Sequence, residues 1–481
     1  MITLSILIGA PALASIISLF SSRLHLVKYA SLAAAAISTI ATLFLASRVA
    51  FSGTVTLSSF FAIDALGMLG ILITSVVGLA AISYSIGYLH NEVNKHIIGP
   101  RRVRQYFVLL NLFLAAMLFA CAAANPIMMW LAIEATTLSS AFLVSFYHKP
   151  SSTEAAWKYL LINSLGLLLG FFGTLLYLSA ASLSGENFIT WQTLLTHASL
   201  LNPDIARLAF VFMLIGYGTK VGLAPMHTWL PDAHSKAPVP ISAMLSGVLL
   251  NIALIAVLRF KTITDTVVGA NFSQHILIVL GLLSIIIAAG MILIQKNYKR
   301  MLAYSSIENM GIMALGFGFG GAASLAALLH MIYHSLTKSL LFLSAGNIFL
   351  TYSSTKIAQV RGVLTTLPVT GILFFAGILA ISGLPPFGIF FTKLAILFTG
   401  SDAHPYAVAI ALLAFAVIFI GFLRHTTNML FGEPPANVVP NIESDRWLLV
   451  APATLLLILA VLSIHMPATL AVLLTTASAT L

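Results

Sequence analysis

The chain has 481 residues, of which 60% are hydrophobic and only 7% are charged, and its mean hydropathy is +1.04. Soluble domains carry about 25% charged residues, so this composition excludes a soluble protein, and long runs that are apolar on all sides exclude an outer-membrane barrel. The formal net charge of +10 comes from basic residues that lie mostly in short loops, which indicates orientation in a membrane and not nucleic-acid binding. The sequence therefore predicts an all-α polytopic membrane protein.

A membrane-spanning helix needs about 20 mainly apolar residues, and fourteen runs of the sequence meet that requirement. The predicted spans are residues 2–21, 29–48, 62–86, 106–124, 126–147, 157–180, 206–228, 238–260, 275–294, 301–320, 323–350, 367–399, 405–430 and 447–475. We expect them to form a single membrane domain over residues 1–481.

The loops between these spans differ strongly in charge. Fourteen of the 23 lysines and arginines lie in loops that follow odd-numbered spans, and four lie in or beside the opposite loops. Basic loops stay on the cytoplasmic side. The pattern therefore predicts an integral protein of a bacterial or archaeal cytoplasmic membrane, with both termini on the non-cytoplasmic side.

Five charged residues lie inside the predicted spans. A lysine or carboxylate at the centre of a span costs about 2.5–3.5 kcal/mol on insertion scales, so each of them needs a structural or functional reason. Glu134 is either one half of a structural ion pair or a protonatable carboxylate, and both can be true. The five are Glu134, Lys220, Glu308, Lys338 and Lys393.

Prolines near two of the lysines predict broken helices. Pro225 follows Lys220 by five residues, and Pro385 and Pro386 precede Lys393. Proline removes a backbone donor, and unwound backbone at membrane depth is tolerated where protein or a water-filled cavity surrounds it. Breaks five spans apart predict two inverted five-helix repeats. Helices 1–3 then occupy residues 1–105, helices 4–8 residues 106–260, helices 9–13 residues 275–430, and the last helix residues 447–475.

The eleventh span carries His330, His334 and Lys338 at i, i+4 and i+8, which places them on one helix face. Two histidines at this spacing can bind zinc, but no third ligand or general-base glutamate lies near them in the sequence, so we expect no metal. Because histidine titrates near neutral pH, the stripe is better suited to carrying protons along hydrated groups.

Three further residues are weaker candidates. Glu308 is shallower in its span and has a local pairing with a basic loop residue as its alternative explanation. His227 and Asp232 lie near a break, where capping or an interfacial position explains them. With Cys121 as the only cysteine, disulfides and cysteine-ligated metal or iron–sulfur sites within the chain are excluded. We expect no cofactor in this chain.

Four segments carry a resemblance to a known family. They are GTKVGLAPMHTWLPDAHSKAPVPISAMLSG, YKRMLAYSSIENMG, HMIYHSLTKSLLFLSAGNI and GLPPFGIFFTK, and with Glu134 and YLLINSLG they cover most of residues 106–400. The chain resembles the antiporter-like proton-translocating subunits of respiratory complex I, membrane-bound [NiFe] hydrogenases and Mrp-type antiporters. Its SSIENMG segment is most similar to component F of the hydrogenase-4 group.

The resemblance implies fourteen helices with inverted repeats, a glutamate–lysine pair at Glu134 and Lys220, and a hydrated axis that ends at a terminal lysine. The axis would run through the stripe on the eleventh span to Lys393. The sequence departs from many relatives in the eighth span, where Asn251 replaces a lysine or histidine. Asparagine cannot relay a proton by titrating, although it can hold a water molecule.

The leading hypothesis is an ion-pumping subunit of a redox-driven complex, in which other membrane subunits and a peripheral arm of hydrogenase or dehydrogenase type handle the electrons. The alternatives are an Mrp-type Na⁺(K⁺)/H⁺ antiporter subunit, a cation-flow subunit of an inorganic-carbon uptake system, and a non-conducting scaffold. Asn251 favours the scaffold, whereas the retained charges oppose it.

Overall fold

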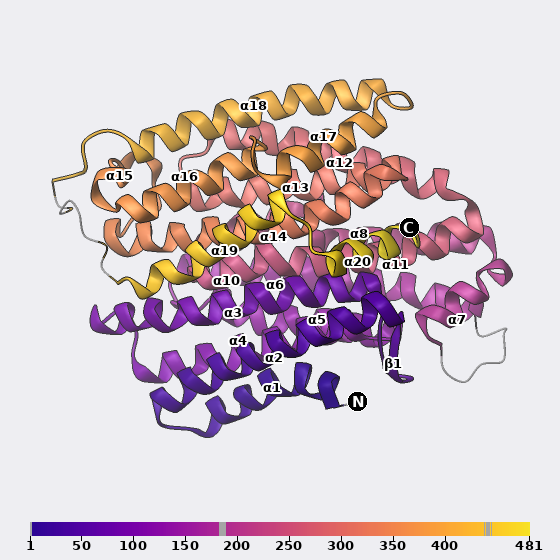
Figure 1. The fold of residues 1–481 in the computed structure, drawn as a ribbon, viewed down its shortest axis with the longest axis horizontal. Coiled ribbons are helices and arrows are strands. Elements are labelled where there is room, and N and C mark those ends of the chain that lie inside the picture. Colours follow the sequence, from indigo (N-terminus) through magenta and orange to yellow (C-terminus); the bar gives the residue numbers. More distant parts are fainter. Residues whose placement is uncertain (1, 182–188, 437, 439–442, 444) are drawn as a thin grey trace.

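The computed structural model describes residues 2–181, 189–436, 438, 443 and 445–481. Nearly all of this chain is helical, and the helices lie side by side along one direction, from α1 at one edge of the molecule to α18 at the other (Figure 1). Both ends of the chain lie at the same end of this bundle (Figure 1). The predicted fold class, an all-α polytopic membrane protein, is confirmed.

The N-terminal part contributes three long helices and a small hairpin. A two-stranded antiparallel ribbon, which the sequence patterns did not predict, interrupts the loop before the third helix. The elements are α1 (Ile2–Phe20), α2 (Leu24–Ser52), β1 (Val55–Ser58), β2 (Phe61–Ile63) and α3 (Ala65–Asn94).

The next part contains the first of the two interrupted helices. Its elements are α4 (Pro100–Ala122), α5 (Pro126–Val144), α6 (Pro150–Ala181), α7 (Trp191–Thr196), η2 (Ala198–Leu200), α8 (Pro203–Val221), η3 (Met226–Thr228), α9 (Trp229–Lys236), α10 (Val239–Met244), η4 (Leu245–Leu249) and α11 (Leu250–Val268). The turn η4 is π-helical, a geometry that is often found at functional sites.

The third part contains the second interrupted helix, and the chain then closes with two shorter helices. The elements are α12 (Ala270–Ile294), α13 (Tyr298–Phe319), α14 (Ala322–Tyr352), η5 (Ile357–Gln359), α15 (Val363–Thr366), α16 (Pro368–Ser382), α17 (Gly388–Gly400), α18 (Pro405–Leu430), α19 (Trp447–Ile464) and α20 (Ala468–Ser478).

Twelve helices of the described chain are long and apolar enough to cross a membrane. The predicted spans at 301–320 and 367–399 are not among them: the first corresponds to α13, which is rich in polar residues, and the second is divided between α16 and α17. The total of fourteen spans and the inverted relation of the repeats stay predictions.

Both predicted interruptions have a glycine at the point where the first helical segment ends. Gly222 follows α8 with φ of 81°, and Gly383 follows α16 with φ of 80°. This left-handed conformation is favourable for glycine, which has no Cβ. Pro225 and the pair Pro385–Pro386 then lie in the non-helical connections.

The predicted C-terminal helix at 447–475 is wrong in one respect. The structure divides it into α19 and α20, with His465, Met466 and Pro467 between them. Proline has no N–H to continue the hydrogen-bond ladder and disfavours a helical conformation in the residue before it.

The centre of the bundle is the eighth predicted span. Every residue from 237 to 261 is buried, and α10 and η4 pack against α14. The helix α14 is itself buried along most of its length and carries the predicted histidine–lysine stripe. The polar groups of residues 237–261 and of most of α14 are therefore enclosed by protein.

Candidate functional site

The described interior contains four buried lysines and glutamates of the predicted set, which lie on α8, α13, α14 and α17. Lys220, Glu308 and Lys338 have no exposed surface, and Lys393 is 7% exposed. Buried charges of this kind are stable only when paired or hydrogen-bonded, so their partners define the site.

Glu134 and Lys220 are joined through a hydroxyl group. Lys220 Nζ on α8 donates to Thr137 Oγ1 at 2.8 Å, and Thr137 Oγ1 donates to Glu134 Oε2 at 3.3 Å. A hydroxyl can accept one hydrogen bond while it donates another. Ser164 Oγ on α6 donates to the other carboxylate oxygen at 2.9 Å. The two charged groups are therefore linked by hydrogen bonds through Thr137, with no direct ion pair between them.

A tyrosine from α6 completes the surroundings of Lys220. The lysine Nζ donates to Tyr159 OH at 2.9 Å and lies 4.9 Å from the centre of its ring. Tyr159 OH in turn lies 2.7 Å from Ser140 Oγ on α5. Two neutral oxygen acceptors and the aromatic face stabilise the ammonium group while leaving it close to the carboxylate.

The interruption after α8 is held by side chains that bind its free backbone groups. Trp229 Nε1 donates to the carbonyl oxygen of Thr219 at 2.8 Å, and Ala224 N donates to Ser284 Oγ at 2.9 Å. Helix ends leave backbone groups without intrahelical partners. These contacts keep the broken segment fixed beside Lys220.

Asn251 connects α11 to the stripe on α14. Its Nδ2 donates to Ser335 Oγ at 2.7 Å and to Gly247 O at 3.0 Å, while its Oδ1 is buried with no hydrogen-bond partner among the described residues. Ser335 follows His334 directly. Asn251 therefore lies at the contact between the two central helices.

The three residues of the predicted stripe have different surroundings. His330 Nε2 lies 2.9 Å from Asn309 Oδ1 and His330 Nδ1 lies 2.8 Å from Thr392 Oγ1, so the ring links α13 to α17. Lys338 donates to Ser305 Oγ and to the carbonyl oxygen of Leu302, both on α13.

His334 lies between His330 and Lys338 on α14 and has no exposed surface. Within the described part of the chain, neither of its ring nitrogens has a hydrogen-bond partner. A buried polar atom without a partner is costly, so a water molecule is the natural ligand for this ring. His334 is the least constrained member of the stripe.

Glu308 forms a buried ion pair with the terminal lysine. Lys393 Nζ on α17 donates to Glu308 Oε1 on α13 at 2.7 Å, and Asn309 Nδ2 donates to the other carboxylate oxygen. The alternative of a local pairing with a basic loop residue is wrong, because Lys299 instead donates to Ala237 O at 2.7 Å. The sequence predicts only an accessory role for Glu308, and its pairing with Lys393 was not predicted.

One signal in the sequence points to the Glu308–Lys393 pair. Within helices 4–8, Glu134 lies in the second helix and Lys220 in the fourth; within helices 9–13, Glu308 lies in the second and Lys393 in the fourth. The same comparison shows the difference between the halves: the second pair is in direct contact, whereas the first is joined through Thr137.

The two accessory residues near the first break lie away from these pairs. Asp232 on α9 accepts from Arg300 at 2.7 Å and lies 3.7 Å from Lys158, in a half-exposed ion-pair cluster at the helix ends. His227 lies in η3, with its ring centre 6.4 Å from that of Tyr304.

An ion pair near the hairpin is structural. Asp64 caps α3 by accepting from Gly67 N at 2.8 Å, and it binds Arg259 through two hydrogen bonds of 2.7 and 2.8 Å. Burial alone would raise the pKa of Asp64, but the Arg259 charge and these hydrogen bonds together hold that pKa below its usual value.

The described residues contain no group of three or more histidine, cysteine, aspartate or glutamate side chains placed to hold a metal ion. The polar interior consists instead of amines, carboxylates, imidazoles, hydroxyls and amides at hydrogen-bonding distances. Such groups can accept and release protons, or bind water molecules that do so.

Comparison with known proteins decides the family. The pattern that defines the family described as "NADH:quinone oxidoreductase/Mrp antiporter, TM" matches residues 123–419, which is more than half of the chain. The chain belongs to this family. It is an integral membrane protein and an antiporter-like subunit of the type shared by complex I, hydrogenase and Mrp systems.

Among its curated relatives is "Hydrogenase-4 component F homolog" of Methylacidiphilum infernorum, which is 39% identical over 79% of this chain and 81% of that protein. Two solved structures share the fold, each with a TM-score of 0.86. One is a chain of an archaeal membrane-bound sulfane sulfur reductase, at 22% identity, covering 99% of this chain and 97% of that one. The other is a chain of the Mrp complex from Dietzia sp. DQ12-45-1b, at 19% identity, covering 100% and 97%.

Proposed function

We propose that this protein translocates protons across the membrane as a subunit of a redox-driven complex. The observation that carries the proposal is that two buried lysines are each linked to a carboxylate, in the units Glu134–Thr137–Lys220 and Glu308–Lys393, together with the polar stripe of α14. Ionisable groups inside a membrane are expensive and mark ion pathways.

In the first unit, Thr137 allows the charge of Glu134 to influence the proton affinity of Lys220 without a direct contact. An approach of the carboxylate to the amine would favour the protonated lysine, and a separation would favour proton release. Because the hydroxyl is shared between both groups, a small side-chain movement is sufficient to change this coupling.

In the middle of the axis we propose that water molecules connect Lys220 to α14. Asn251 Oδ1 and both nitrogens of His334 are buried polar atoms without a described partner, and such atoms are the usual ligands of internal water. Asn251 would then hold a water molecule that transfers the proton, although its own side chain does not titrate.

In the second unit, Lys338 and His330 both bind groups on α13 close to Glu308, and Glu308 contacts Lys393. We propose that a proton arriving along α14 weakens the ion pair between Glu308 and Lys393. Lys393 would then release a proton at the end of the axis. Helices 4–8 and 9–13 would act as the two inverted repeats that support one unit each.

The partners of such a subunit would be other membrane subunits and a peripheral arm that carries out the redox reaction. Support comes from the relative named as a hydrogenase component and from the fold shared with a respiratory sulfur reductase. We place the protein in the cytoplasmic membrane with both termini outside the cytoplasm, as the loop charges indicate.

The decisive experiment uses the intact complex in proteoliposomes. We expect Lys220→Gln to abolish redox-driven proton uptake while assembly and electron transfer to the natural acceptor are retained. Lys261→Gln is the matched control, because Lys261 is equally buried but pairs with Asp265 away from this axis. Undiminished pumping by Lys220→Gln would reject the proposed role.

Exchange of Na⁺ or K⁺ for protons is a second candidate function. Glu134 is only half-buried, and the hydroxyls of Thr137 and Ser164 lie beside its carboxylate, which gives the oxygen-rich environment that alkali ions prefer. Proton flux that depends on sodium or potassium in the same proteoliposomes would favour this alternative, whereas flux indifferent to both ions would favour proton pumping alone.

A further inference from the structure

A groove opens on the outside of the bundle where α1, α4 and α5 come together. Its volume is about 610 Å³, within the range of ligand-binding sites in proteins. None of its lining residues belongs to the two lysine–carboxylate units, and the proposed proton axis does not use them. Its lining includes Arg101, Arg102 and Arg104 from the first turns of α4 and His148 from the loop after α5.

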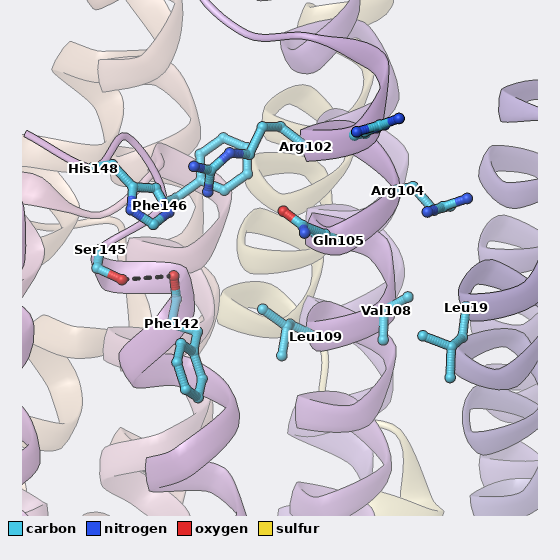
Figure 2. A pocket seen from close by; sticks show the side chains of 11 residues that line it. Leu19, Arg102, Arg104, Gln105, Val108, Leu109, Phe142, Ser145, Phe146 and His148 are labelled. Carbon is cyan, nitrogen blue, oxygen red and sulfur yellow. Dashed lines mark hydrogen bonds between the residues drawn. The ribbon is translucent and has the colours of Figure 1, made fainter. Parts of the chain in front are cut away.

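The charged end of this groove has no acidic counterpart. All of its ionisable lining residues are basic, and none of the ion pairs found among the described residues involves the three arginines. Arg102 extends toward Phe146 and His148 on the α5 side, and Arg104 extends toward α1 (Figure 2). The N-terminal end of α4 adds its positive dipole. The groove is therefore suited to an anion.

The other end of the groove is apolar. Leu109 and Phe142 lie below Arg102, and Val108 and Leu19 lie on the α1 side (Figure 2). Val108 follows Arg104 by four residues, one helical turn of about 5.4 Å further along α4. Phe142 is 65% exposed and Leu19 is 55% exposed. The groove thus combines a cationic end with an exposed apolar wall that continues along the helices.

We propose that this groove binds an anionic phospholipid, with its phosphate on the arginines and its acyl chains along Leu19, Val108, Leu109 and Phe142. The groove lies where three membrane helices end, which is the depth of lipid headgroups. Guanidinium groups match phosphate geometry through paired N–H donors. An acidic protein segment could satisfy the charge, but it would leave the apolar wall along the helices uncovered, whereas a lipid satisfies both.

The test replaces Phe142 with the photo-crosslinking residue p-benzoylphenylalanine in the intact complex, in a bilayer of phosphatidylcholine with a minor fraction of phosphatidylglycerol. Mass spectrometry then identifies what is attached. We expect phosphatidylglycerol to be enriched roughly tenfold over its share of the bilayer. The same replacement at Leu131 is the control, since this residue lies on α5 with 51% exposure and does not line the groove.

The triple variant Arg101→Gln, Arg102→Gln, Arg104→Gln should return the attached lipids at residue 142 to the bulk composition, and the corresponding triple lysine variant should keep most of the enrichment. If the glutamine variant fails to assemble, the lipids attached at positions 142 and 131 can still be compared with the arginines intact. That comparison alone tests whether the groove selects an anionic lipid. Attached lipid of bulk composition at position 142, or attachment of another protein subunit in place of lipid, would overturn the proposal.

Discussion

Lys393 and Glu308 form an ion pair of 2.7 Å in the interior, between two helices that are distant in sequence. The contact joins α17, the segment that follows the second helix break, to α13. It gives the second half of the chain a carboxylate–lysine unit that corresponds to the one in the first half. The direct contact also means that Lys393 cannot lose its proton without leaving a buried carboxylate unpaired.

We predict that Glu308→Gln destabilises the protein and stops proton release. Removal of one partner from a buried ion pair costs about 3–5 kcal/mol, because the other charge stays buried. Thermal unfolding of the purified complex should show a lower midpoint, and proteoliposomes should show no redox-driven pumping.

The double variant Glu308→Gln with Lys393→Met separates these two effects. With both charges removed, much of the lost stability should return, since hydrophobic replacement of a buried pair is often neutral or stabilising. Pumping should stay absent. Recovery of pumping in this double variant would contradict a role of the pair in proton transfer.

We predict that proton pumping requires the hydroxyl of Thr137 and does not require its methyl group. Thr137→Val removes the bridge between Lys220 and Glu134 and should lower the pumping rate by roughly tenfold, which corresponds to the loss of about 1.4 kcal/mol of coupling. Thr137→Ser keeps the oxygen and should retain most of the rate. Equal rates for the valine and serine variants would show that the bridge has no function.

We predict that Asn251 can be replaced by a titratable residue more readily than by an apolar one. Asn251→Leu removes the hydrogen bond to Ser335 and the unpartnered Oδ1, so it should slow proton transfer between the two units. Asn251→His restores polar atoms at the same place and should pump at least as fast as the unmodified protein. A leucine variant with unchanged flux would place the proton path elsewhere.

The Asp64–Arg259 pair predicts a pH-dependent contribution to stability. The pKa of Asp64 is depressed in the folded protein, so the pair stabilises the fold above the unfolded value of about 3.9. The contribution is lost as the pH falls through the folded pKa. Asp64→Asn should therefore lower the unfolding midpoint at neutral pH.

The difference in midpoint between Asp64→Asn and the unmodified protein should begin to narrow as the pH falls below about 4, where Asp64 of the unfolded chain becomes protonated. It should vanish only below the lower folded pKa, where Asp64 is neutral in both states. The loss of the α3 cap remains small, since asparagine is also a good N-cap residue. Thermal unfolding of the detergent-solubilised protein over this pH range measures the difference. A difference in unfolding midpoint that stays constant to low pH would show that the Asp64–Arg259 ion pair is not its cause.

The sequence was sufficient for the fold class because few charges and long apolar runs leave few alternatives. It also predicted both helix breaks, since proline and glycine act on the backbone locally. It failed where the deciding contact is distant: the spacing of Glu308 within its own span says nothing about Lys393, 85 residues later. Thr137 was not predicted as a site residue, because a threonine in a helix is ordinary unless its two hydrogen-bond partners are known.

Boundaries at the end of the chain were harder to predict for a different reason. The apolar run at 447–475 continues across Pro467, so composition alone favours one helix, and the proline decides otherwise. The hairpin of β1 and β2 is too short to produce a clear alternating pattern. Neither segment carries a residue of the candidate site.

The complete burial of residues 237–261 has a consequence for how the protein is made. This segment leaves the ribosome before α14, which later covers it and binds Asn251 through Ser335. Until α14 is in place, the Asn251 side chain lacks its hydrogen bond to Ser335. The burial of this segment is therefore complete only after α14 has packed against α10 and η4.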